Sequence, residues 1–575
     1  MNYFDDEEEW LWLFEHAIDW QNIIPLYPVS NEYQNSEETL GFFKELLSAT
    51  GSWAGSTVYQ RAEILDKEGA GEVKDGKTIP GPALLDFYKE AVEMQTFGIP
   101  IPEKFGGMEL PVSIYGLVVQ QLSQSCIASS TQYSFHSSIG IILDMYADEE
   151  QKQEFIPKII TGEISGSMNM TEPHCGSDVG AIRTQAVHVE DNVYELTGSK
   201  IFITNGGGGL GVILARVKGD EPGLKGLSLF LMPQKWEDNE TNFIVAKNEH
   251  KTGLHGSFTC EVVYDKSKAW LLGEQGQGFT YMLHLMNEAR ILTGMQALGG
   301  IEGSLRYAIN YAKERTQFGK PLTELPLMKK NLHDFCVERD ALRAFMADSI
   351  SWFDISYRLD YISHSRELSE SESVILKKAS KVIRKRTPLV KYFCCEAFTR
   401  LSTKAIQVLG GYGFMNEYPV ERYHRDSFGP LLYEGTSQIQ ALMAFKDYLK
   451  SLLKDPKKLA TGLLFSTADC EYDLDSTTKS VLESFEVKFQ RNMSWLIFKI
   501  AKQKKYNLLD KKQVENLAED LSAEAENICQ AIGNIEILKV LAHHATKSDS
   551  RMTLFTEWQK IARRRLALIY QSWRD

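Results

Sequence analysis

The sequence lacks several features that would mark particular classes of protein. Its eight cysteines are scattered, and no two of them form a Cys-x-x-Cys pair, which disfavours a structural zinc site and favours a reducing compartment. No apolar run approaches the roughly 20 residues that a membrane-spanning helix needs. The stretch from Asp5 to Glu9 is acidic where secretory and mitochondrial leaders are basic, so we expect a cytoplasmic protein.

Positive charge is scarce as well. Lysine and arginine number 63 against 77 aspartates and glutamates, and the net charge is −14. A nucleic-acid partner is therefore not expected, because binding phosphates requires a basic surface. The basic end around Arg563 to Arg565 could touch anionic lipid, but a helix docked in a bundle is the preferred interpretation, so membrane contact is not expected either. The basic positions between Lys377 and Arg386 are interpreted mainly as solvated surface.

The spacing of apolar residues divides the 575-residue chain into helical and strand-rich parts. Residues 1–35 predict one short amphipathic helix packed on the body, and residues 36–165 predict a helical domain with glycine and proline breaks. Residues 166–272 hold short β-branched segments separated by turns, which predicts a small β-barrel or sandwich. Residues 273–453 and 454–575 are again helical, so the fold class is mainly α with an inserted β-domain.

The stretch from Gly410 to Gln440 carries the clearest chemical signal. It begins with a Gly-Gly-Tyr-Gly-Phe turn and ends in Tyr-Glu-Gly-Thr-Ser-Gln-Ile-Gln, with Glu434 as the acid. Glu434 has no cation within three residues and follows aromatic and aliphatic neighbours, so we expect a partly desolvated carboxylate whose raised pKa suits a general base. The alternative is a helix N-terminus in which Gly435 and Thr436 supply a turn and a cap.

This stretch resembles the C-terminal signature of the acyl-CoA dehydrogenase family, in which the glutamate of Tyr-Glu-Gly-Thr removes the α-proton of the substrate. Three further motifs stand in the family's order: Pro-Glu-x-x-Gly-Gly at 102–107, Thr-Glu-Pro-x-x-Gly-Ser-Asp at 171–178, and Phe-Ile-Thr-Asn-Gly at 202–206. The resemblance extends from Ser36 to Leu453. It implies an N-terminal helical domain, a middle β-barrel and a C-terminal four-helix bundle. An added helical domain also occurs in an extended subclass that includes 3-methylmercaptopropionyl-CoA dehydrogenase.

The resemblance also implies partners and roles. It implies FAD as cofactor, an acyl-CoA substrate, electron-transferring flavoprotein as electron acceptor, and a homodimer or higher homo-oligomer. Glu434 is the implied catalytic base. The implied cofactor contacts are Met168, Met170, Thr171, Ser177, Phe202, Thr204, Arg315, Gln317, Phe318, Gln407, Gly410, Gly411, Thr436 and Gln438. The implied substrate contacts are Ser177, Asn287, Arg290 and Gly435.

Two of these groups are expected to act across a subunit interface. In the family, the arginine that matches Arg315 binds the pyrophosphate of the neighbouring subunit's FAD, a role that suits the planar guanidinium. The positions of Gln407, Gly410 and Gly411 cover the adenosine end of the same cofactor from the other subunit. The resemblance therefore implies at least a dimer.

The sequence departs from the family pattern at several positions. Phe202 stands where many members have tryptophan, and Met168 where medium-chain enzymes have tyrosine, but both remain apolar surfaces for a flavin. Asn287 replaces an aspartate. Ala289 stands where the isovaleryl and long-chain members carry their base, and alanine cannot serve, so the base is assigned to Glu434. The adjacent Glu288 faces about 100° around the helix and is a poor alternative.

Other signals are rejected or left open. Residues 206–211 fit Gly-x-Gly-x-x-Gly, but a dinucleotide site needs a helix next, and residues 212–216 predict a strand. His250 and His255 have no third ligand at a suitable spacing, so no metal is expected. An acyl-CoA oxidase that uses O2 stays open as an alternative function, and a DNA-binding alkylation-response flavoprotein is disfavoured by the acidic charge.

Overall fold

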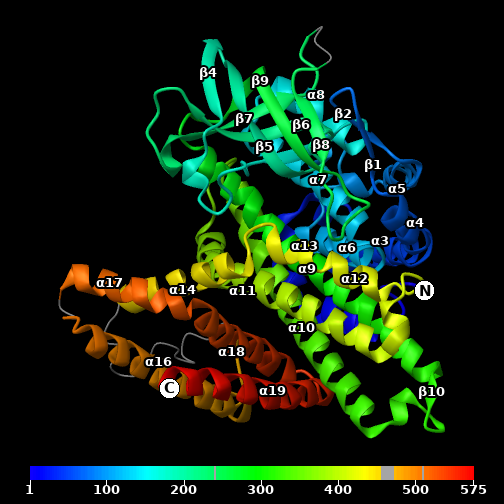
Figure 1. The fold of residues 1–575 in the computed structure, drawn as a ribbon, viewed down its shortest axis with the longest axis vertical. Coiled ribbons are helices and arrows are strands. Elements are labelled where there is room, and N and C mark those ends of the chain that lie inside the picture. Colours follow the sequence, from blue (N-terminus) through cyan, green and yellow to red (C-terminus); the bar gives the residue numbers. More distant parts are fainter. Residues whose placement is uncertain (238–240, 455–471, 508–509) are drawn as a thin grey trace.

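The computed structural model describes residues 1–237, 241–454, 472–507 and 510–575 (Figure 1). The helical segment that the sequence predicts at 463–465 lies outside these ranges, as does the Asp455-Pro456 pair that precedes it. Figure 1 shows the β-barrel at one end of the molecule, long helices through its middle, and a layer of C-terminal helices at the other end.

The N-terminal helical part surrounds two adjacent buried helices. Its helices are α3 (Ser36–Trp53), α4 (Tyr59–Glu68), α5 (Pro82–Glu93), α6 (Val112–Ser125), α7 (Ile127–Tyr146) and α8 (Glu149–Ile160). Every residue of α6 is buried, and α7 is buried along most of its length. Both helices are buried although they carry several serines and glutamines, so these polar side chains need hydrogen-bond partners inside the protein.

A hairpin interrupts these helices. It lies at residues 71–80, where the sequence predicts only breaks between helices at glycine and proline. Strands β1 (Gly71–Lys74) and β2 (Lys77–Pro80) pair antiparallel across a two-residue loop. Asp75 and Gly76 both have positive φ, at 52° and 74°. An Asp-Gly pair is the usual sequence of such a tight hairpin loop, so the sequence does carry a local signal for this hairpin.

The middle part is a closed β-barrel, which is one of the two folds predicted for it, a barrel or a sandwich. Its strands are β3 (Ser165–Asn169), β4 (Gln185–Glu190), β5 (Val193–Thr204), β6 (Gly209–Val217), β7 (Leu227–Pro233), β8 (Ile244–Asn248) and β9 (Thr259–Leu272). The order β6-β4-β5-β9-β7 closes because β7 also pairs with β6, while β3 and β8 add at the outside. Strand β6 is the strand predicted directly after the glycine-rich residues 206–211.

Four long helices form the core of the next part. They are α9 (Gly278–Glu314), α10 (Pro326–Ser363), α11 (Glu370–Leu409) and α14 (Ser437–Lys454). Between α11 and α14 the chain forms the short helices η9 (Gly410–Phe414), α12 (Val420–Asp426) and α13 (Phe428–Leu432). A capping box of Ser369 and Glu372 starts α11 directly after the polar interruption. The hairpin β10 (Thr316–Gln317) and β11 (Lys320–Pro321) separates α9 from α10.

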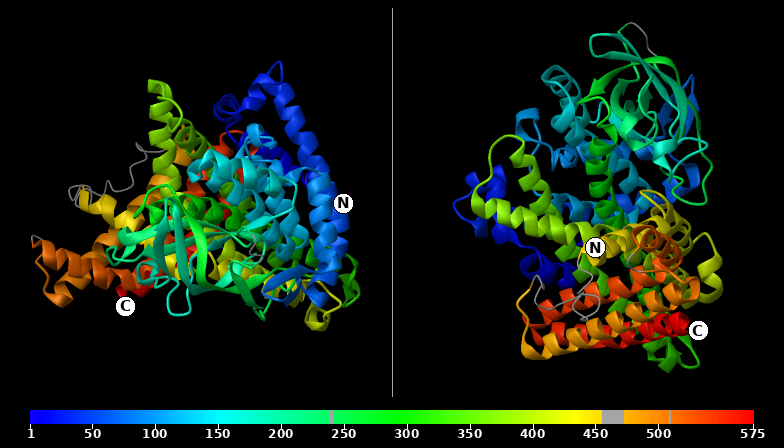
Figure 2. Two further views of the ribbon diagram at one scale, coloured as in Figure 1. Left: turned by 90° about the horizontal axis from the view of Figure 1, so that it is seen from above. Right: turned by 90° about the vertical axis from the view of Figure 1, so that its left-hand side faces the viewer.

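The C-terminal part packs against this bundle. It contains α16 (Ser476–Lys504), α17 (Lys511–Leu521), α18 (Ala525–Ala545) and α19 (Asp549–Arg574). Helix α18 is almost wholly buried and contacts α10, α14, α16 and α19. Figure 2 shows the C-terminal helices, coloured orange to red, stacked at the end of the molecule away from the barrel. Arg565 of α19 donates to the buried Glu338 of α10 at 2.6 Å. The basic end of α19 therefore packs at least in part on α10, in agreement with the expected helix docked in a bundle. Within the described residues, no helix combines the length and the apolar character needed to cross a bilayer.

The N-terminal extension is more than the single helix predicted. It contains α1 (Glu8–His16), α2 (Trp20–Ile23) and two further short turns of helix. Trp10 donates its indole N–H to Glu302 of α9 at 3.0 Å, while Glu9 pairs with Arg551 of α19. The extension therefore contacts both the four-helix core and the C-terminal helices.

One prediction about the surface holds for four basic residues and fails for two: the exposed ones are Lys377, Lys378, Lys381 and Arg384. The basic positions of α11 were interpreted mainly as solvated, but Arg386 is 0% exposed and Lys385 pairs with Glu536 of α18 at 2.9 Å. Arg386 also pairs with Asp348 of α10. The acidic groups that these cations meet belong to other helices of the same chain, and the sequence alone did not place them together.

Candidate active site

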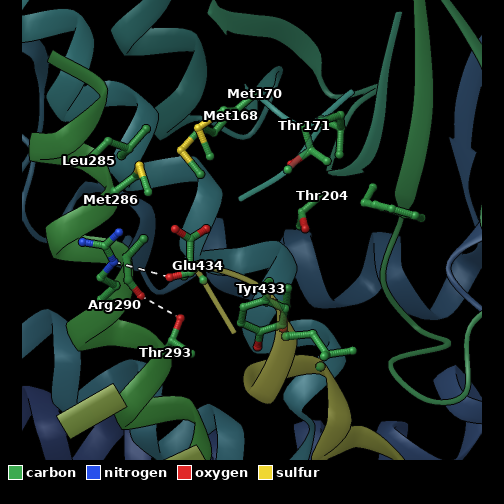
Figure 3. A pocket seen from close by; sticks show the side chains of 18 of the residues that line it. Met168, Met170, Thr171, Thr204, Leu285, Met286, Arg290, Thr293, Tyr433 and Glu434 are labelled. Atoms are coloured by element: carbon green, nitrogen blue, oxygen red, sulfur yellow. Dashed lines mark hydrogen bonds between the residues drawn. The ribbon is translucent and has the colours of Figure 1, made fainter. Parts of the chain in front are cut away.

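A cavity of about 710 Å³ lies where the barrel meets α7, α9 and the segment between α13 and α14 (Figure 3). Ten of the residues singled out from the sequence line it, and they come from three distant parts of the chain. They are Met168, Met170, Thr171, Ser177, Phe202, Thr204, Arg290, Glu434, Gly435 and Thr436. The fold therefore brings the predicted flavin motifs and the predicted base to one chamber.

The other predicted residues lie elsewhere. Arg315, Gln317 and Phe318 belong to the exposed β10–β11 hairpin, and Gln407, Gly410 and Gly411 lie at the exposed end of α11. These two groups adjoin each other, because the Arg315 guanidinium lies 5.7 Å from the ring centroid of Tyr412. Phe318 is 90% exposed. None of the six lines the cavity of its own chain.

Two further predicted residues lie just outside the chamber. Asn287 does not line it but accepts a hydrogen bond from Arg290 Nη1 at 3.1 Å, so it contacts a residue that does. Gln438 is exposed on the first turn of α14. Thr436 accepts from the N–H of Ile439 at 3.4 Å, so the capping interpretation of this threonine holds beside its place in the cavity wall.

The backbone at Glu434 is held in an uncommon conformation. Glu434 and Gly435 both have left-handed φ values, +56° and +93°. Such a conformation costs a non-glycine residue about 1 kcal/mol or more, so neighbouring contacts have to maintain it. At Gly435 an added Cβ would lie 2.7 Å from Gln440 Nε2, so glycine is needed there on two grounds.

Three side chains from three helices hold this turn by its carbonyl oxygens. Arg290 Nε of α9 and Gln440 Nε2 of α14 donate to the carbonyl of Glu434 at 3.3 and 2.9 Å. Lys391 Nζ of α11 donates to the carbonyls of Gly435 and Leu431 at 2.6 and 3.2 Å. With the backbone fixed in this way, the Glu434 carboxylate points into the cavity toward Met168 and Met170 (Figure 3).

Burial raises the pKa of the Glu434 carboxyl, and Arg290 and Lys391 offset part of that rise. Its Oε2 atom has no hydrogen-bond partner among the described residues. The sequence places no cation within three residues of Glu434, but the fold brings cations close to it from other segments. Two cations approach from α9 and α11, but the direction of the pKa change is the predicted one.

Lys391 and Gln440 were missed by the sequence reasoning. A signal existed for the lysine, because Lys391 is the one charged residue between Leu389 and Cys395, an otherwise apolar or aromatic run. A single charge inside such a run indicates a buried cation that needs partners. For Gln440 the sequence held no comparable signal.

A second buried carboxyl lies nearby but outside the cavity. Burial raises the pKa of Glu288 to about 7, and Ser138 Oγ donates to Glu288 Oε1 at 3.1 Å. Glu288 does not line the cavity, whereas Ala289 and Arg290 do. Its direction around α9 therefore agrees with its rejection as a base.

Replacing Glu288 with glutamine should leave the cavity wall intact and change the pH dependence of stability. A carboxyl whose pKa rises from 4.5 unfolded to about 7 folded takes up a proton on folding, so stability falls as pH rises through this window, by up to about 3 kcal/mol. Chemical denaturation of both proteins at pH 5 and pH 8 measures it. An unchanged pH dependence would contradict this assignment of proton affinity.

Glu172, in the Thr-Glu-Pro motif, has a structural role. Its carboxylate accepts from Lys200 Nζ at 2.9 Å, from Thr184 Oγ1 at 2.5 Å and from the N–H of Arg183 at 2.8 Å. His174 and Cys175 lie close enough to form a possible metal-binding group with it. The carboxylate oxygens of Glu172 are already engaged by an ammonium, a hydroxyl and a backbone N–H. Glu172 is therefore better suited to holding this turn against the barrel than to binding a metal ion.

Comparisons with known proteins agree with this geometry. The chain matches the family models for the N-terminal domain of acyl-CoA dehydrogenase at residues 60–163, the middle domain at 167–267 and the C-terminal domain at 276–355 and 366–449. It is 36% identical over 353 residues to an acyl-CoA dehydrogenase of Bacillus subtilis, a match that covers 61% of this chain and 86% of the relative. It is 29% identical over 462 residues to 3-methylmercaptopropionyl-CoA dehydrogenase of Ruegeria pomeroyi, covering 77% and 75% of the two chains.

A solved structure extends the likeness over nearly the whole chain. The FAD complex of an acyl-CoA dehydrogenase from Bacillus anthracis aligns with a TM-score of 0.76 at 21% identity, covering 98% of this chain and 91% of that one. The fold is thus the one that the three family models describe, with added C-terminal helices. The chain belongs to the acyl-CoA dehydrogenase family, and its cofactor is FAD.

The wall of the cavity on the barrel side fits this cofactor. Thr171 and Thr204 present hydroxyl side chains to the chamber opposite Glu434 (Figure 3). Phe202, which also lines the chamber, is 61% exposed and has a left-handed φ of 60°, an unusual and costly placement for a phenylalanine. A flavin ring needs hydroxyl or amide donors at its edge and an apolar face against it, and these residues supply both.

Proposed function

We propose that the chain converts an acyl-CoA thioester to the trans-2-enoyl-CoA, with Glu434 as the base that removes the α-proton. FAD, held by Thr171, Phe202 and Thr204 in the cavity wall, would supply the acceptor for the β-hydride, and electron-transferring flavoprotein would then accept the electrons. The observation that carries the proposal is the Glu434 carboxylate, which points into the cavity with a raised pKa and one oxygen without a partner among the described residues. A base of this kind can take a proton near neutral pH.

The α-proton of a thioester becomes acidic only when its carbonyl oxygen is polarised. We infer that the backbone N–H of Glu434 contributes here, because it makes no hydrogen bond within the described part of the chain. The left-handed turn fixes where this N–H points, and the donors from Arg290 and Gln440 hold the turn by the carbonyl of the same residue. A donor fixed before the reaction stabilises developing negative charge without reorganisation.

We also propose that the exposed group at the β10–β11 hairpin and the end of α11 contacts the FAD of a second subunit. Its members are Arg315, Gln317, Phe318, Gln407, Gly410 and Gly411. The exposure of this region supports the proposal, since Phe318 is 90% exposed and Phe414 of the adjacent η9 is 81% exposed, and both are apolar surfaces that a partner subunit would cover. Thr436 and Gln438 are assigned to the cofactor, and Ser177, Asn287, Arg290 and Gly435 to the substrate.

Anaerobic titration of the purified protein with butyryl-, octanoyl- and palmitoyl-CoA tests the reaction. At least one of them should bleach the visible absorbance of the oxidised flavin, and the preferred chain length identifies the substrate class. If none of the three, nor a branched-chain acyl-CoA, reduces the flavin, the proposed reaction is wrong. Air admitted after reduction separates the alternatives, because an acyl-CoA oxidase regains its colour rapidly without electron-transferring flavoprotein.

A further inference from the structure

Lys391 is a buried cation that contacts the loop of the proposed base without lining the substrate cavity. It projects from the middle of α11, is 0% exposed, and donates from Nζ to the carbonyls of Gly435 and Leu431. Leu431 belongs to the last turn of α13, whose free carbonyls attract positive charge. Gly435 directly follows Glu434. A single ammonium group therefore spans the loop on both sides of the acid.

The charged and titratable groups around Lys391 come from three segments. Glu434 lies on the loop, Arg290 on α9, and Cys395 and Glu396 on α11 itself. Burial raises the pKa of Cys395 to about 11, so this thiol is uncharged near neutral pH. Among the acids on the loop side, Glu434 is the one whose ionisation Lys391 favours.

We propose that Lys391 is a positioning residue for Glu434, which holds the left-handed turn through the carbonyl oxygens of Gly435 and Leu431 and adds its positive charge to that of Arg290 beside the base. This inference rests on the proposed function of Glu434. The turn needs such support because it places a non-glycine residue in a strained conformation. The charge matters because a cation inside a poorly solvated site acts on a nearby carboxylate more strongly than it would in water.

The geometry separates the role of Lys391 from that of Arg290. Arg290 lines the cavity and donates to the carbonyl of Glu434 itself, so its replacement would alter the wall that faces the substrate. Lys391 acts from behind the loop. A change at Lys391 therefore reports on the loop and its charge, and the surface that the acyl-CoA meets stays as it is.

Lys391→Met should move the pH at which flavin reduction is half-maximal upward by about one unit, because the carboxylate loses a neighbouring cation. At pH 7 the rate should fall at least about tenfold, since the loop is also less well held. The rate constant of reduction is measured by anaerobic stopped flow on the FAD-loaded protein from pH 6 to 9, with the acyl-CoA that reduces the wild type fastest. Lys391→Arg keeps the charge and should keep the wild-type midpoint at a lower rate.

The matched control is Lys381→Met, the same substitution ten positions earlier on the same helix, where the side chain is exposed. It should change neither midpoint nor rate. A second readout needs no turnover: infrared titration of the Glu434 carboxyl in the protein without substrate, with Glu434→Gln as the blank, should show the same upward shift in Lys391→Met. If Lys391→Met does not fold, Lys391→Gln removes the charge but keeps a donor, and its midpoint must rise as well.

Two outcomes overturn the inference. In the first, Lys391→Met reduces its flavin more slowly or is less thermostable, but the pH midpoint of flavin reduction is unchanged. The lysine would then be purely structural. In the second, the midpoint shifts equally in Lys381→Met, which makes the shift a general charge effect. If Glu434 is not the base, the result is distinguishable from both of these outcomes, because the flavin of Glu434→Gln would then still be reduced at the wild-type rate.

Discussion

Replacing Glu434 with glutamine is expected to abolish turnover while leaving the protein folded and yellow. Glutamine has the shape of glutamate but cannot take up the α-proton, and Ala289 on α9 offers no replacement base. The loss should be at least about 10³-fold in the rate of flavin reduction, because an unassisted α-proton is only weakly acidic. Stopped-flow reduction under anaerobic conditions measures the rate, and the bound flavin is quantified after denaturation.

The structure offers a matched control for this variant in Glu288→Gln. Both substitutions remove one buried carboxyl within the same region, but only Glu434 lines the cavity. The first should be inactive and the second active. Full reduction of the flavin by Glu434→Gln at an undiminished rate would place the base elsewhere, and reciprocal behaviour of the two variants would assign it to Glu288.

The sequence predicted the architecture well because each part has a strong local period. The alternating β-branched segments after residue 165 form the barrel, and the apolar spacing from Gly278 to Lys313 forms α9. The family resemblance in addition predicts that the flavin motifs and Glu434 meet in one site. What these signals share is that they depend on short stretches of chain, so each can be recognised without knowing what packs against it.

Long-range contacts account for most of what the sequence did not predict. Lys391 and Gln440 reach the carbonyls around Glu434 from α11 and α14, and no local pattern states where those helices cross. The left-handed φ of Glu434 follows from the same contacts. The burial of Arg386 was missed for a related reason, because its acidic partners lie on α10 and α18. The charge of a residue was visible in the sequence, but its partners were not.

The network around Arg386 joins the C-terminal helices to the catalytic core. Arg386 Nη2 donates to Tyr472 at 2.9 Å, its Nε lies 3.6 Å from Glu536 of α18, and its other terminal nitrogen pairs with Asp348 of α10. Burial alone would raise the pKa of Glu536, but Lys385, Lys539 and Arg386 together hold it well below its usual range. The acid is thus ionised only because cations surround it.

Arg386→Met should therefore destabilise the protein strongly, by about 3–5 kcal/mol, because it leaves Asp348 and Glu536 buried with one cation fewer. Arg384→Met is the control from the same turn of α11: its side chain is 59% exposed and pairs with Asp447, so its loss should cost at most about 1 kcal/mol. Urea unfolding followed by circular dichroism measures both, and flavin fluorescence shows whether the core loses its cofactor at the same urea concentration. Equal losses of stability in the two variants would mean that the network contributes no more than an exposed ion pair.

In Arg386→Met, part of the circular-dichroism signal could be lost at a urea concentration at which the flavin is still bound. That result would show that the C-terminal helices separate from a core that remains folded.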